Sequence, residues 1–318
     1  MPSLVSVVIP CHNAAPWLAA TLASVRAQTW PTIETIIVDD GSTDDSLAIA
    51  RLHGQRAVIL TQANAGAAAA RNRGLRAATG EYIQFLDADD LLAPDKIECQ
   101  LRQLEKRAES ARVVAAGPWG RFEDDPSTAR FVPEENWRDA SPVEWLTLNF
   151  AGRGMMPPAA WLTPRAVIDA AGPWDERLTL NDDGEYFCRV LLASAGVRFC
   201  PEARSFYRSN LAGSLSRRRS ESAWKSALLS QECCIRHLLA AEDSPRTRRA
   251  AADLMQRLAH AAWPDSPSVA ARAQRLAQAH GGSPLRPGGG PLFCGLSMIF
   301  GWRFARRIQE LRRSRSSR

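Results

Sequence analysis

Lysine and paired cysteines are scarce in this sequence. Only three lysines occur among its 318 residues, so arginine supplies nearly all of the 40 basic side chains. The seven cysteines include no C-x-x-C pair. They outline neither a disulfide framework nor a zinc site, which favours a reducing compartment.

Segments that direct a chain into or across a membrane are also missing. The chain starts with a strand-like run in place of a basic segment followed by an apolar one, so we do not expect secretion. No uninterrupted apolar run reaches the roughly 18 residues that a transmembrane helix needs. These absences together predict a cytoplasmic protein.

The positive charge is confined to one end of the chain. The formal net charge is +6, which by itself would suggest a nucleic-acid partner. Residues 1–90 carry 6 basic and 9 acidic side chains, and residues 91–210 carry 15 and 18, so each of these segments has a net charge of −3. Residues 211–318 carry 19 basic and 7 acidic side chains, a net charge of +12. An acidic body repels phosphate, so we expect no nucleic-acid partner.

Short apolar runs alternate with helix-spaced segments through the first 90 residues. This alternation predicts βαβ units in a doubly wound α/β sheet, whose functional groups gather beyond the carboxyl ends of the strands. Residues 91–110 and 221–280 are predicted to be helical. The expected strands are 4–9, 35–38, 57–60 and 82–86, and the expected helices between them are 17–28, 44–52 and 67–78.

Two acidic clusters follow predicted strands, Asp39-Asp40 and Asp87-Ala88-Asp89-Asp90. Carboxylates that gather at the end of a buried strand repel one another and lose hydration, so such clusters indicate a function. The D-x-D spacing of Asp87 and Asp89 supplies the oxygen ligands that Mg²⁺ or Mn²⁺ prefers when it holds a diphosphate. The alternative interpretation is an N-terminal cap for the helix predicted from Leu91.

Three segments together carry a family resemblance. They are SVVIPCHNAAPWLAATLASVRAQTW (6–30), IETIIVDDGSTDDS (33–46) and NAGAAAARNRGLRAATGEYIQFLDADD (64–90). In this order and spacing they resemble the nucleotide-sugar domain of family-two glycosyltransferases, continuously over residues 4–110. The resemblance implies the GT-A fold, a Rossmann-like, doubly wound mixed sheet, and an inverting, metal-dependent transfer of a sugar.

The resemblance also implies which residues bind the nucleotide. Pro10, His12 and Asn13 are similar to the first nucleotide-contacting loop, although the family usually has tyrosine where this chain has His12. Asp40 is similar to the aspartate that accepts a hydrogen bond from uracil, a role that suits an acceptor-only carboxylate. Asp39 is then its partner or orienting residue. An Asp-Gly-Ser turn is compatible with both roles.

The metal and diphosphate side of the site follows from the same resemblance. Arg71 looks like the arginine that helps to hold the nucleotide, because its cationic fork suits phosphate. Asp87 would contact both the ribose and a Mn²⁺ or Mg²⁺ ion, and Asp89 would be the main protein ligand of that ion. The metal would neutralise the leaving diphosphate.

An inverting transfer also needs a general base for the acceptor hydroxyl. Residues 172–189 contain GPWDE and NDDGEYFCR, which resemble the acceptor-side acidic motif of the family. Aligning Arg189 with the arginine that follows this motif places Asp183 as the base and Asp182 before it. Glu185 is the competing candidate, and the alternative is an N-terminal charge cluster on a helix over 184–195.

The remaining chain is predicted to divide into several parts. Residues 1–215 form the GT-A domain, with a nucleotide-sugar half (1–110) and an acceptor half (111–215). Its end, from Tyr207-Arg208 to Arg217, resembles a loop that closes over the diphosphate, where either Arg208 or a histidine would serve. A helical extension (216–280), a Gly/Pro linker (281–291) and a basic amphipathic tail (292–318) follow.

The tail interleaves apolar side chains with arginines, LFCGLSMIFGWRFARRIQELRRSRSSR. This pattern fits an interfacial helix on anionic lipid, which would make the protein peripheral on the inner face of the membrane. It fits equally well a helix that docks on the domain and carries a solvated basic end.

We therefore predict a glycosyltransferase with a nucleotide-sugar donor, most simply a UDP-sugar. Its acceptor would be a hydroxyl of a saccharide or of a lipid-linked molecule in cell-surface polysaccharide or glycan synthesis. One alternative is a nucleotidyltransferase-like enzyme, but a Gly-rich basic loop is missing after the first strand. The other is a basic membrane- or nucleic-acid-binding module without catalysis, which leaves the acidic motifs unexplained.

Overall fold

A computed structural model describes residues 2–54, 56–105, 110–211, 219–288 and 290–316 of the chain. Its first part alternates strands and helices as the apolar pattern predicts, with boundaries within two residues of the predicted ones. The elements are β1 (Val5–Cys11), α1 (Ala15–Arg26), β2 (Ile33–Asp40), α2 (Ser46–His53), β3 (Val58–Gln62), α3 (Ala67–Ala77) and β4 (Tyr82–Phe85).

The second part of the chain has shorter strands and more loops. Three single-turn helices lie within it at Ser110–Arg112, Pro126–Thr128 and Pro158–Ala160. The other elements are β5 (Leu91–Leu92), α4 (Lys96–Glu105), β6 (Val113–Ala116), β7 (Trp119–Phe122), α5 (Pro142–Phe150), β8 (Trp161–Pro164), α6 (Arg165–Ala171), α7 (Asp182–Ala193), β9 (Gly196–Phe199) and β10 (Ser205–Arg208).

Seven strands form one mixed sheet in the order β3-β2-β1-β4-β8-β6-β9. The strands β3, β2, β1 and β4 are parallel neighbours, and β8 runs antiparallel to both β4 and β6. Cys11 lies opposite Asp39, and Val8 lies opposite Phe85. The carboxyl ends of β1, β2 and β4 therefore meet at one edge, where both acidic clusters lie. The predicted α/β class with a doubly wound mixed sheet is confirmed.

A second sheet joins β5, β10 and β7 in that order. The prediction of a helix from Leu91 is wrong here, because Leu91 and Leu92 pair with Phe206 and Ser205 and are buried. The helix α4 begins only at Lys96, after Pro94. A partner strand more than a hundred residues away has overridden the local pattern. The small sheet connects the loop that carries Asp87 and Asp89 directly to the acceptor half.

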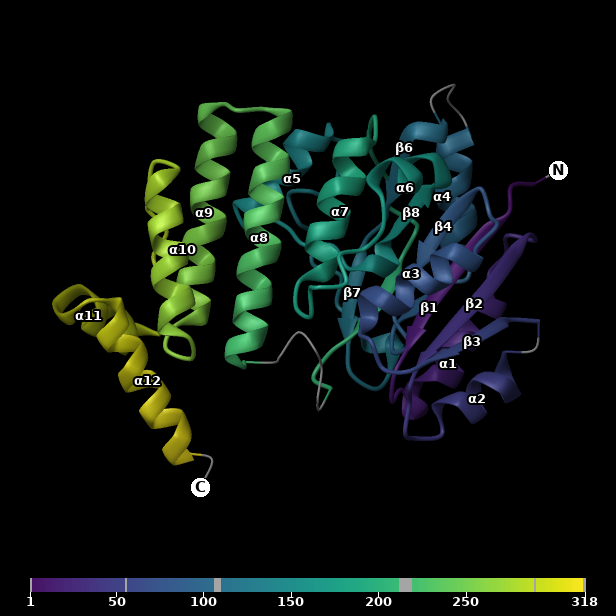
Figure 1. The fold of residues 1–318 in the computed structure, drawn as a ribbon, viewed down its shortest axis with the longest axis horizontal. Helices are drawn as coiled ribbons and strands as arrows, with labels where there is room; N and C mark the ends of the chain where they lie inside the picture. Colours follow the sequence, from purple (N-terminus) through teal and green to yellow (C-terminus); the bar gives the residue numbers. More distant parts are fainter. Residues whose placement is uncertain (1, 55, 106–109, 212–218, 289, 317–318) are drawn as a thin grey trace.

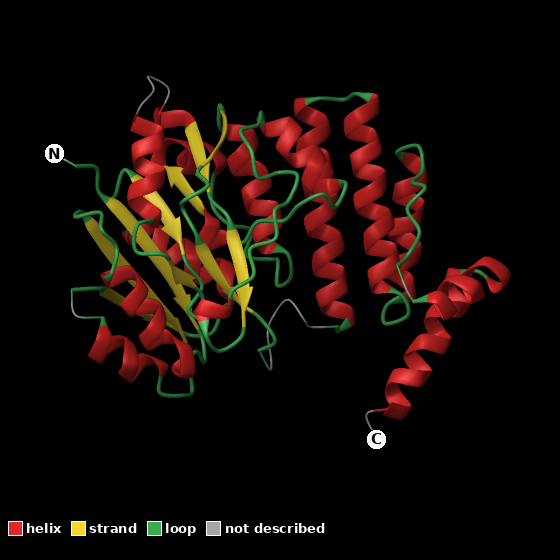
Figure 2. Cartoon of the chain, turned by 180° about the vertical axis from the view of Figure 1, so that it is seen from behind, coloured by secondary structure: helices red, strands yellow, loops and turns green. Residues whose placement is uncertain are grey.

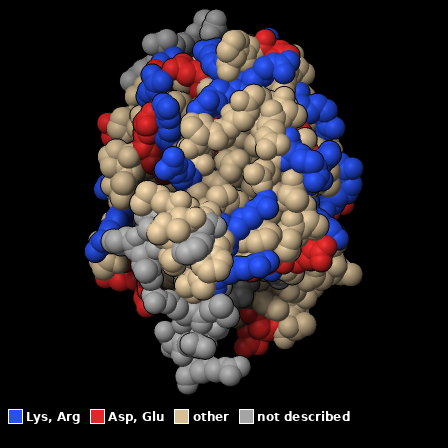
Figure 3. Space-filling view, turned by 90° about the vertical axis from the view of Figure 1, so that its left-hand side faces the viewer, with Lys and Arg blue, Asp and Glu red and all other residues tan. Residues whose placement is uncertain are grey.

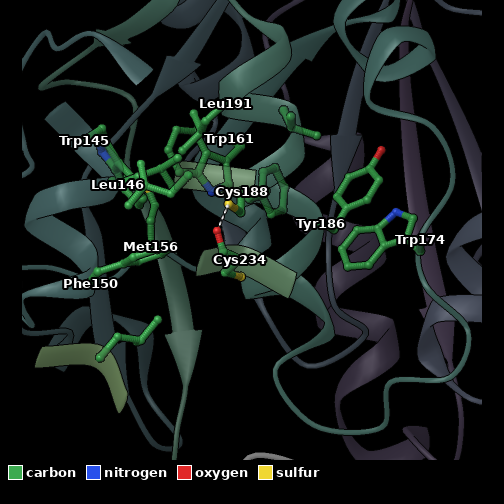
Figure 4. Close-up of a cluster of buried hydrophobic side chains, with 14 of the residues drawn as sticks. Trp145, Leu146, Phe150, Met156, Trp161, Trp174, Tyr186, Cys188, Leu191 and Cys234 are labelled. Carbon is green, nitrogen blue, oxygen red and sulfur yellow. Dashed lines mark hydrogen bonds between the residues drawn. The ribbon is translucent and has the colours of Figure 1, made fainter. Parts of the chain in front are cut away.

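The two faces of the large sheet bury separate apolar cores. Val8 belongs to one core, whereas Val7 and Ile9 belong to the other, because successive strand residues point to opposite faces. The first core is rich in aromatic side chains, several of which are shown in Figure 4. In it the Trp174 ring stacks on the Tyr186 ring with 3.9 Å between centroids.

Three long helices stand beside this domain: α8 (Glu221–Ala241), α9 (Pro245–Ala262) and α10 (Pro267–Ala279). Figure 1 shows α8 next to α7, with α9 and α10 beyond it, and Figure 2 shows the strands gathered in one half of the molecule. Pro245 and Pro267 occupy the first turns of α9 and α10, where a missing N–H costs no hydrogen bond. The prolines thus begin helices of the predicted helical extension.

The tail folds into two helices, α11 (Pro291–Phe300) and α12 (Trp302–Ser316). Gly301 separates them with a φ of +81°, a backbone conformation that favours glycine. They lie at the far end of the molecule from the N-terminus (Figure 1). None of the helices in the described ranges combines the length and the apolar character needed to span a membrane.

Candidate active site

Arg71 connects two acidic segments that lie far apart in the sequence. It lies on α3 and is only 5% exposed. Its Nη2 donates to Asp87 Oδ1 and its Nη1 to Asp182 Oδ2, each at 2.7 Å. Its guanidinium also lies over the Trp174 ring, 4.5 Å from the centroid. The D-x-D segment and the first turn of α7 are therefore held at one centre, 95 residues apart in the sequence.

The charge of this arginine is stabilised by its two partners. Burial by itself would lower the pKa of Arg71, but the carboxylates of Asp87 and Asp182 outweigh burial and raise it. The guanidinium stays charged, and the two carboxylates compensate it. The sequence predicted Arg71 and Asp87 as site residues, but it gave no sign that Arg71 also binds Asp182.

A second layer of contacts fixes this centre, and sequence reasoning did not identify it. The Asn72 side chain donates to the Trp174 carbonyl at 3.0 Å and to Glu176 Oε1 at 2.8 Å. Its Oδ1 accepts a hydrogen bond from the Trp174 N–H at 2.8 Å. Trp174 in turn stacks on Tyr186 (Figure 4). The GPWDE segment was the available signal for these contacts, but the sequence prediction used it only as part of the family resemblance and gave Trp174 and Glu176 no role.

The helical extension also supports the site. Ser226 Oγ of α8 accepts hydrogen bonds from the backbone N–H groups of Thr179 and Leu180 at 2.8 and 3.0 Å. Ser230 Oγ accepts from Asn181 Nδ2 and donates to the Asn181 carbonyl, both at 2.7 Å. Asn181 has a left-handed backbone and precedes the first residue of α7. The two serines therefore hold the turn that presents Asp182 and Asp183.

Asp183, the predicted base, is a partly buried carboxylate in the first turn of α7. Burial and then the charge of Asp182 raise its pKa to about 6, while Arg71 acts in the opposite direction. Its Oδ1 accepts a hydrogen bond from the Gly184 N–H at 2.9 Å. The competing candidate, Glu185, is 3% exposed and forms an ion pair with Arg189 at 2.7 Å. The geometry therefore favours Asp183 over Glu185.

The loop after β4 is tied to β10. The Arg208 N–H donates to Asp90 Oδ1 at 2.9 Å, and the Arg208 side chain donates to the carbonyls of Asp89 at 3.0 Å and Glu123 at 2.6 Å. The guanidinium also lies 4.4 Å from the Phe122 ring centroid. Arg208, a candidate for closing over the diphosphate, is here an anchor of the D-x-D loop. Residues 212–218 of the predicted closing loop lie outside the described residues.

Asp87 and Asp89 are the two carboxylates predicted to bind a metal. No three His, Cys, Asp or Glu side chains of the described segments are grouped so that they could hold an ion. Burial and then the charge of Asp87 raise the pKa of Asp89 to about 6, and Asp90 Oδ2 is buried without a hydrogen-bond partner. This loop is therefore short of positive charge. Its oxygen donors fit Mg²⁺ or Mn²⁺, which usually takes one or two carboxylates and completes its shell with phosphate and water.

The nucleotide side of the site divides the roles of Asp39 and Asp40. Asp40 Oδ1 accepts from Gln62 Nε2 at 2.7 Å and from the Ala65 N–H at 2.8 Å, and its Oδ2 accepts from the Gly66 N–H at 2.8 Å. Asp39 is 4% exposed, and its Oδ1 has no hydrogen-bond partner. Asp40 thus organises the loop before α3, whereas Asp39 offers the free acceptor. The predicted roles, with Asp40 accepting a hydrogen bond from uracil and Asp39 as its partner, stay predictions.

The predicted loop after β1 lies beside these aspartates. Pro10 is half-buried in β1, and the exposed His12 ring has its Nδ1 2.9 Å from the Asp40 carbonyl oxygen. Asn13 has a φ of 50°, and its Oδ1 accepts a hydrogen bond from the Thr43 N–H at 2.8 Å. The structure therefore brings the predicted loop and the acidic end of β2 together.

Comparison with known proteins agrees with this geometry. The family model described as "Glycosyl transferase family 2" matches residues 6–163. The fold is similar to that of Staphylococcus aureus TarS, which was solved in complex with UDP-GlcNAc. The TM-score is 0.62 at 16% identity, over 87% of this chain and 88% of the TarS chain. It is also similar to mannosyltransferase PcManGT of Pyrobaculum calidifontis, solved with GDP-Man and Mn²⁺, with a TM-score of 0.55 at 17% identity over 96% of this chain and 83% of the other.

Curated relatives also match part of the chain. An uncharacterized glycosyltransferase of Escherichia coli, YibD, is 36% identical over 155 residues, which are 46% of this chain and 44% of that protein. Glycosyltransferase GlyG of Streptococcus pneumoniae is 28% identical over 233 residues, which are 70% of this chain and 76% of that protein. The chain covers 60% or less of the length of several of these relatives.

The mixed sheet and the acidic centre at its strand ends define a glycosyltransferase of the GT-A class. Within that class, the matched segment and the relatives place the chain in one family. Residues 6–163 of the chain belong to glycosyltransferase family 2.

Proposed function

We propose that this protein is an inverting glycosyltransferase that moves a sugar from a nucleotide-sugar to a hydroxyl group of its acceptor. One observation carries the proposal. Arg71 binds Asp87 of the D-x-D segment and Asp182 of the acceptor-side motif, each at 2.7 Å, so donor and acceptor chemistry share one centre. The residues at that centre can bind the donor, hold a metal ion and take up the proton of the acceptor.

The donor would bind at the carboxyl ends of β1, β2 and β4. The unpartnered Asp39 Oδ1 suits an imide N–H of uracil, and TarS was solved with UDP-GlcNAc, so we propose a UDP-sugar. PcManGT was solved with GDP-Man, and guanine also presents a ring N–H, so a GDP-sugar is the first competitor to test. Arg71 would orient the ribose-side carboxylate Asp87 and contribute positive charge beside the diphosphate.

Asp87 and Asp89 would hold Mn²⁺ or Mg²⁺ together with oxygens of the diphosphate. When bound, such an ion supplies positive charge that stabilises the leaving diphosphate. The raised pKa of Asp89 supports this assignment, because a nearby cation would favour its ionised form. PcManGT was solved with Mn²⁺, which supports a divalent ion in this fold.

Asp183 would act as the general base. It takes the proton of the acceptor hydroxyl while the oxygen forms a bond to the anomeric carbon. The bond from that carbon to the diphosphate breaks with its electron pair on the leaving oxygen, so the anomeric configuration inverts. A pKa near 6 leaves Asp183 mostly ionised at neutral pH, which general-base catalysis requires.

We also propose that the tail contacts a membrane that carries a lipid-linked acceptor. Met298 and Ile299 of α11 are 75% and 74% exposed, and Phe304 of α12 is 45% exposed. These three side chains lie on either side of Gly301. The same segment carries Arg303 and Arg307, whose guanidinium groups lie over the Trp263 ring. Figure 3 shows this end of the molecule, where Lys and Arg side chains border uncharged surface. Apolar area next to arginines suits an anionic lipid surface.

A thermal-shift screen with UDP-, GDP-, dTDP- and CMP-sugars tests the donor proposal, because a ligand that binds the native state raises its melting temperature. We expect the UDP-sugars to give the largest shift and Mn²⁺ to increase it. Transfer or hydrolysis of the best donor is then measured. The proposal is wrong if no nucleotide-sugar is bound or consumed, or if Asp89→Ala and Asp183→Ala both keep full activity.

Flotation with liposomes tests the membrane contact. The full chain should float with vesicles that contain about one third phosphatidylserine, and a chain ending at residue 290 should not. Replacing Met298 and Ile299 with serine should weaken flotation without changing donor binding. Equal flotation of the full and shortened chains would refute this contact.

A further inference from the structure

A cavity outside the catalytic centre lies in the acceptor half. It has a volume of about 180 Å³, and its lining residues are Trp119, Arg121, Arg130, Val132, Glu134 and Met155. It belongs to a region of the chain, residues 111–170, in which the sequence shows no recognisable motif. The question is which chemical group these side chains would recognise.

The small sheet connects this cavity to the catalytic centre. Trp119 and Arg121 belong to β7, which pairs with β10, and β10 pairs with β5 immediately after Asp90. Neighbouring strands lie about 4.8 Å apart, so β7 runs roughly 10 Å from the strand that follows the D-x-D segment. Within β10, the Arg208 side chain donates to the Asp89 carbonyl, and the ring of the preceding residue, Tyr207, contacts the Trp119 ring. An oligosaccharide acceptor can span this distance.

The wall of the cavity is a fixed aromatic surface. The Trp119 indole N–H donates to the Met155 carbonyl at 3.0 Å, and its ring meets the Tyr207 ring edge-on with 5.9 Å between centroids. Arg121 lies over both rings, 4.9 and 5.1 Å from their centroids. Trp119 is only 7% exposed, and the two rings hold the Arg121 guanidinium above them, so little side-chain entropy is lost when Arg121 binds an anion.

The charges at the cavity are not balanced within the described chain. The backbones of Arg121 and Arg130 pair with each other as an isolated bridge, which brings these two cations to the same cavity. Neither guanidinium has an ion-pair partner in the described ranges of the chain. Glu134, the one acidic lining residue, has its Oε2 engaged by the Met155 N–H at 2.8 Å. Paired arginines of this kind recognise carboxylate or phosphate groups.

We propose that this cavity, defined by Trp119, Arg121 and Arg130, is a subsite for an anionic sugar of the acceptor. The carboxylate or phosphate group of the sugar accepts hydrogen bonds from the two arginines, of which Arg121 is held in place by the Trp119 ring beneath it. The proposal deepens the proposed function, on which it rests, because it names the acceptor as an acidic or phosphorylated saccharide.

Titration calorimetry on the full chain tests the subsite, with UDP and Mn²⁺ present to fill the donor site. The probes are methyl glucoside, methyl glucuronide and glucose 6-phosphate. We expect at least one anionic probe to bind about tenfold or more tightly than the neutral one, because charge-assisted hydrogen bonds are the stronger kind. The tighter of the two anionic probes tells carboxylate from phosphate.

A double variant then assigns the preference to the cavity. Arg121→Gln with Arg130→Gln should remove the preference for the anionic probes, because the amides keep hydrogen-bond donors but not the charge. Arg51→Gln is the matched control, since Arg51 is an exposed arginine on α2, far from the cavity in the sequence. Both side chains are exposed, and circular dichroism checks that the double variant is folded.

Three outcomes would overturn the proposal. They are equal affinity for neutral and anionic probes, no binding of any probe, and an anion preference that survives in the double variant. Failure of the proposed function is seen separately, because UDP binding and donor turnover of the wild-type chain are read without the acceptor probes. A wild-type chain that binds the anionic probe but not UDP would retain the subsite and refute the donor assignment.

Discussion

Replacing Asp183 with asparagine should slow transfer strongly and at the same time stabilise the fold. Burial, followed by the charge of Asp182, raises the pKa of Asp183 to about 6, from an ordinary value near 4. Above pH 6 the carboxylate is ionised in the folded and the unfolded chain, so the folded state carries the whole electrostatic penalty. At about 1.4 kcal/mol for each tenfold change in a protonation constant, this penalty is at most about 3 kcal/mol.

The sign of the pH dependence follows from the direction of this shift. The pKa of Asp183 is higher in the folded than in the unfolded chain, so the folded chain binds more protons between about pH 4 and pH 6. Lowering the pH through 6 therefore removes the penalty, and below about pH 4 both states are neutral. Asparagine has no charge at any pH. Allowing for solvent screening, Asp183→Asn should stabilise the fold by about 1–3 kcal/mol at pH 7.5 and by almost nothing at pH 4.

Urea unfolding at the two pH values measures this effect, and donor turnover measures the loss of the base. We expect kcat for transfer to fall by about 10²–10⁴, the usual contribution of a general base, while UDP affinity stays close to that of the wild type. Asp124→Asn is the matched control, because Asp124 is exposed and its replacement should change stability by less than about 0.5 kcal/mol. An Asp183→Asn variant that is no more stable at pH 7.5, that gains equally at both pH values, or that transfers sugar normally would refute the reasoning.

Four further predictions follow from the same centre. Arg71→Met should lower the free energy of unfolding by about 3–5 kcal/mol in urea titrations, because it leaves Asp87 and Asp182 without their cation; a loss below 1 kcal/mol would contradict the ion-pair description. Asp39→Asn should weaken UDP binding by about tenfold in calorimetry, with little change in stability. Asp40→Ala should instead destabilise the fold by about 1–3 kcal/mol, because three hydrogen-bond donors lose their acceptor. Equal effects of the two variants would contradict the assigned roles. Asp89→Asn should remove the increase in donor affinity that Mn²⁺ produces but not the metal-free binding, and an unchanged Mn²⁺ response would refute this ligand. The wild-type kcat should fall as the pH is lowered through about 6, where Asp183 takes up a proton, and a flat profile between pH 5 and 8 would contradict its role.

The local pattern of the sequence was sufficient for the donor half of the fold. Alternation of β-branched runs with helix-spaced segments locates β1 to β4 to within two residues, because these elements form from neighbouring parts of the chain. It failed at Leu91, where the partner strand β10 lies more than a hundred residues away. The predicted domain boundaries stay predictions.

The candidate site shows the same division between local and long-range information. Motif spacing identified Arg71, Asp87, Asp89 and Asp183 as candidates, since each lies in a short recognisable segment. It could not show that Arg71 binds Asp182, because that contact joins segments far apart in the chain. Nor could spacing tell Asp39 from Asp40. Only the loop before α3 decides which of these carboxylates has its oxygens already occupied.

Local periodicity and short motifs were enough to predict the fold class, the family and the residue types of the candidate site. The tertiary structure decided which acidic groups share one arginine, how burial raises the pKa of Asp89 and Asp183, and how Ser226 and Ser230 of α8 hold the turn before α7. It also brought Trp119, Arg121 and Arg130 to one cavity. Such properties arise from charges, burial and hydrogen bonds between distant segments, and these exist only once the chain has folded.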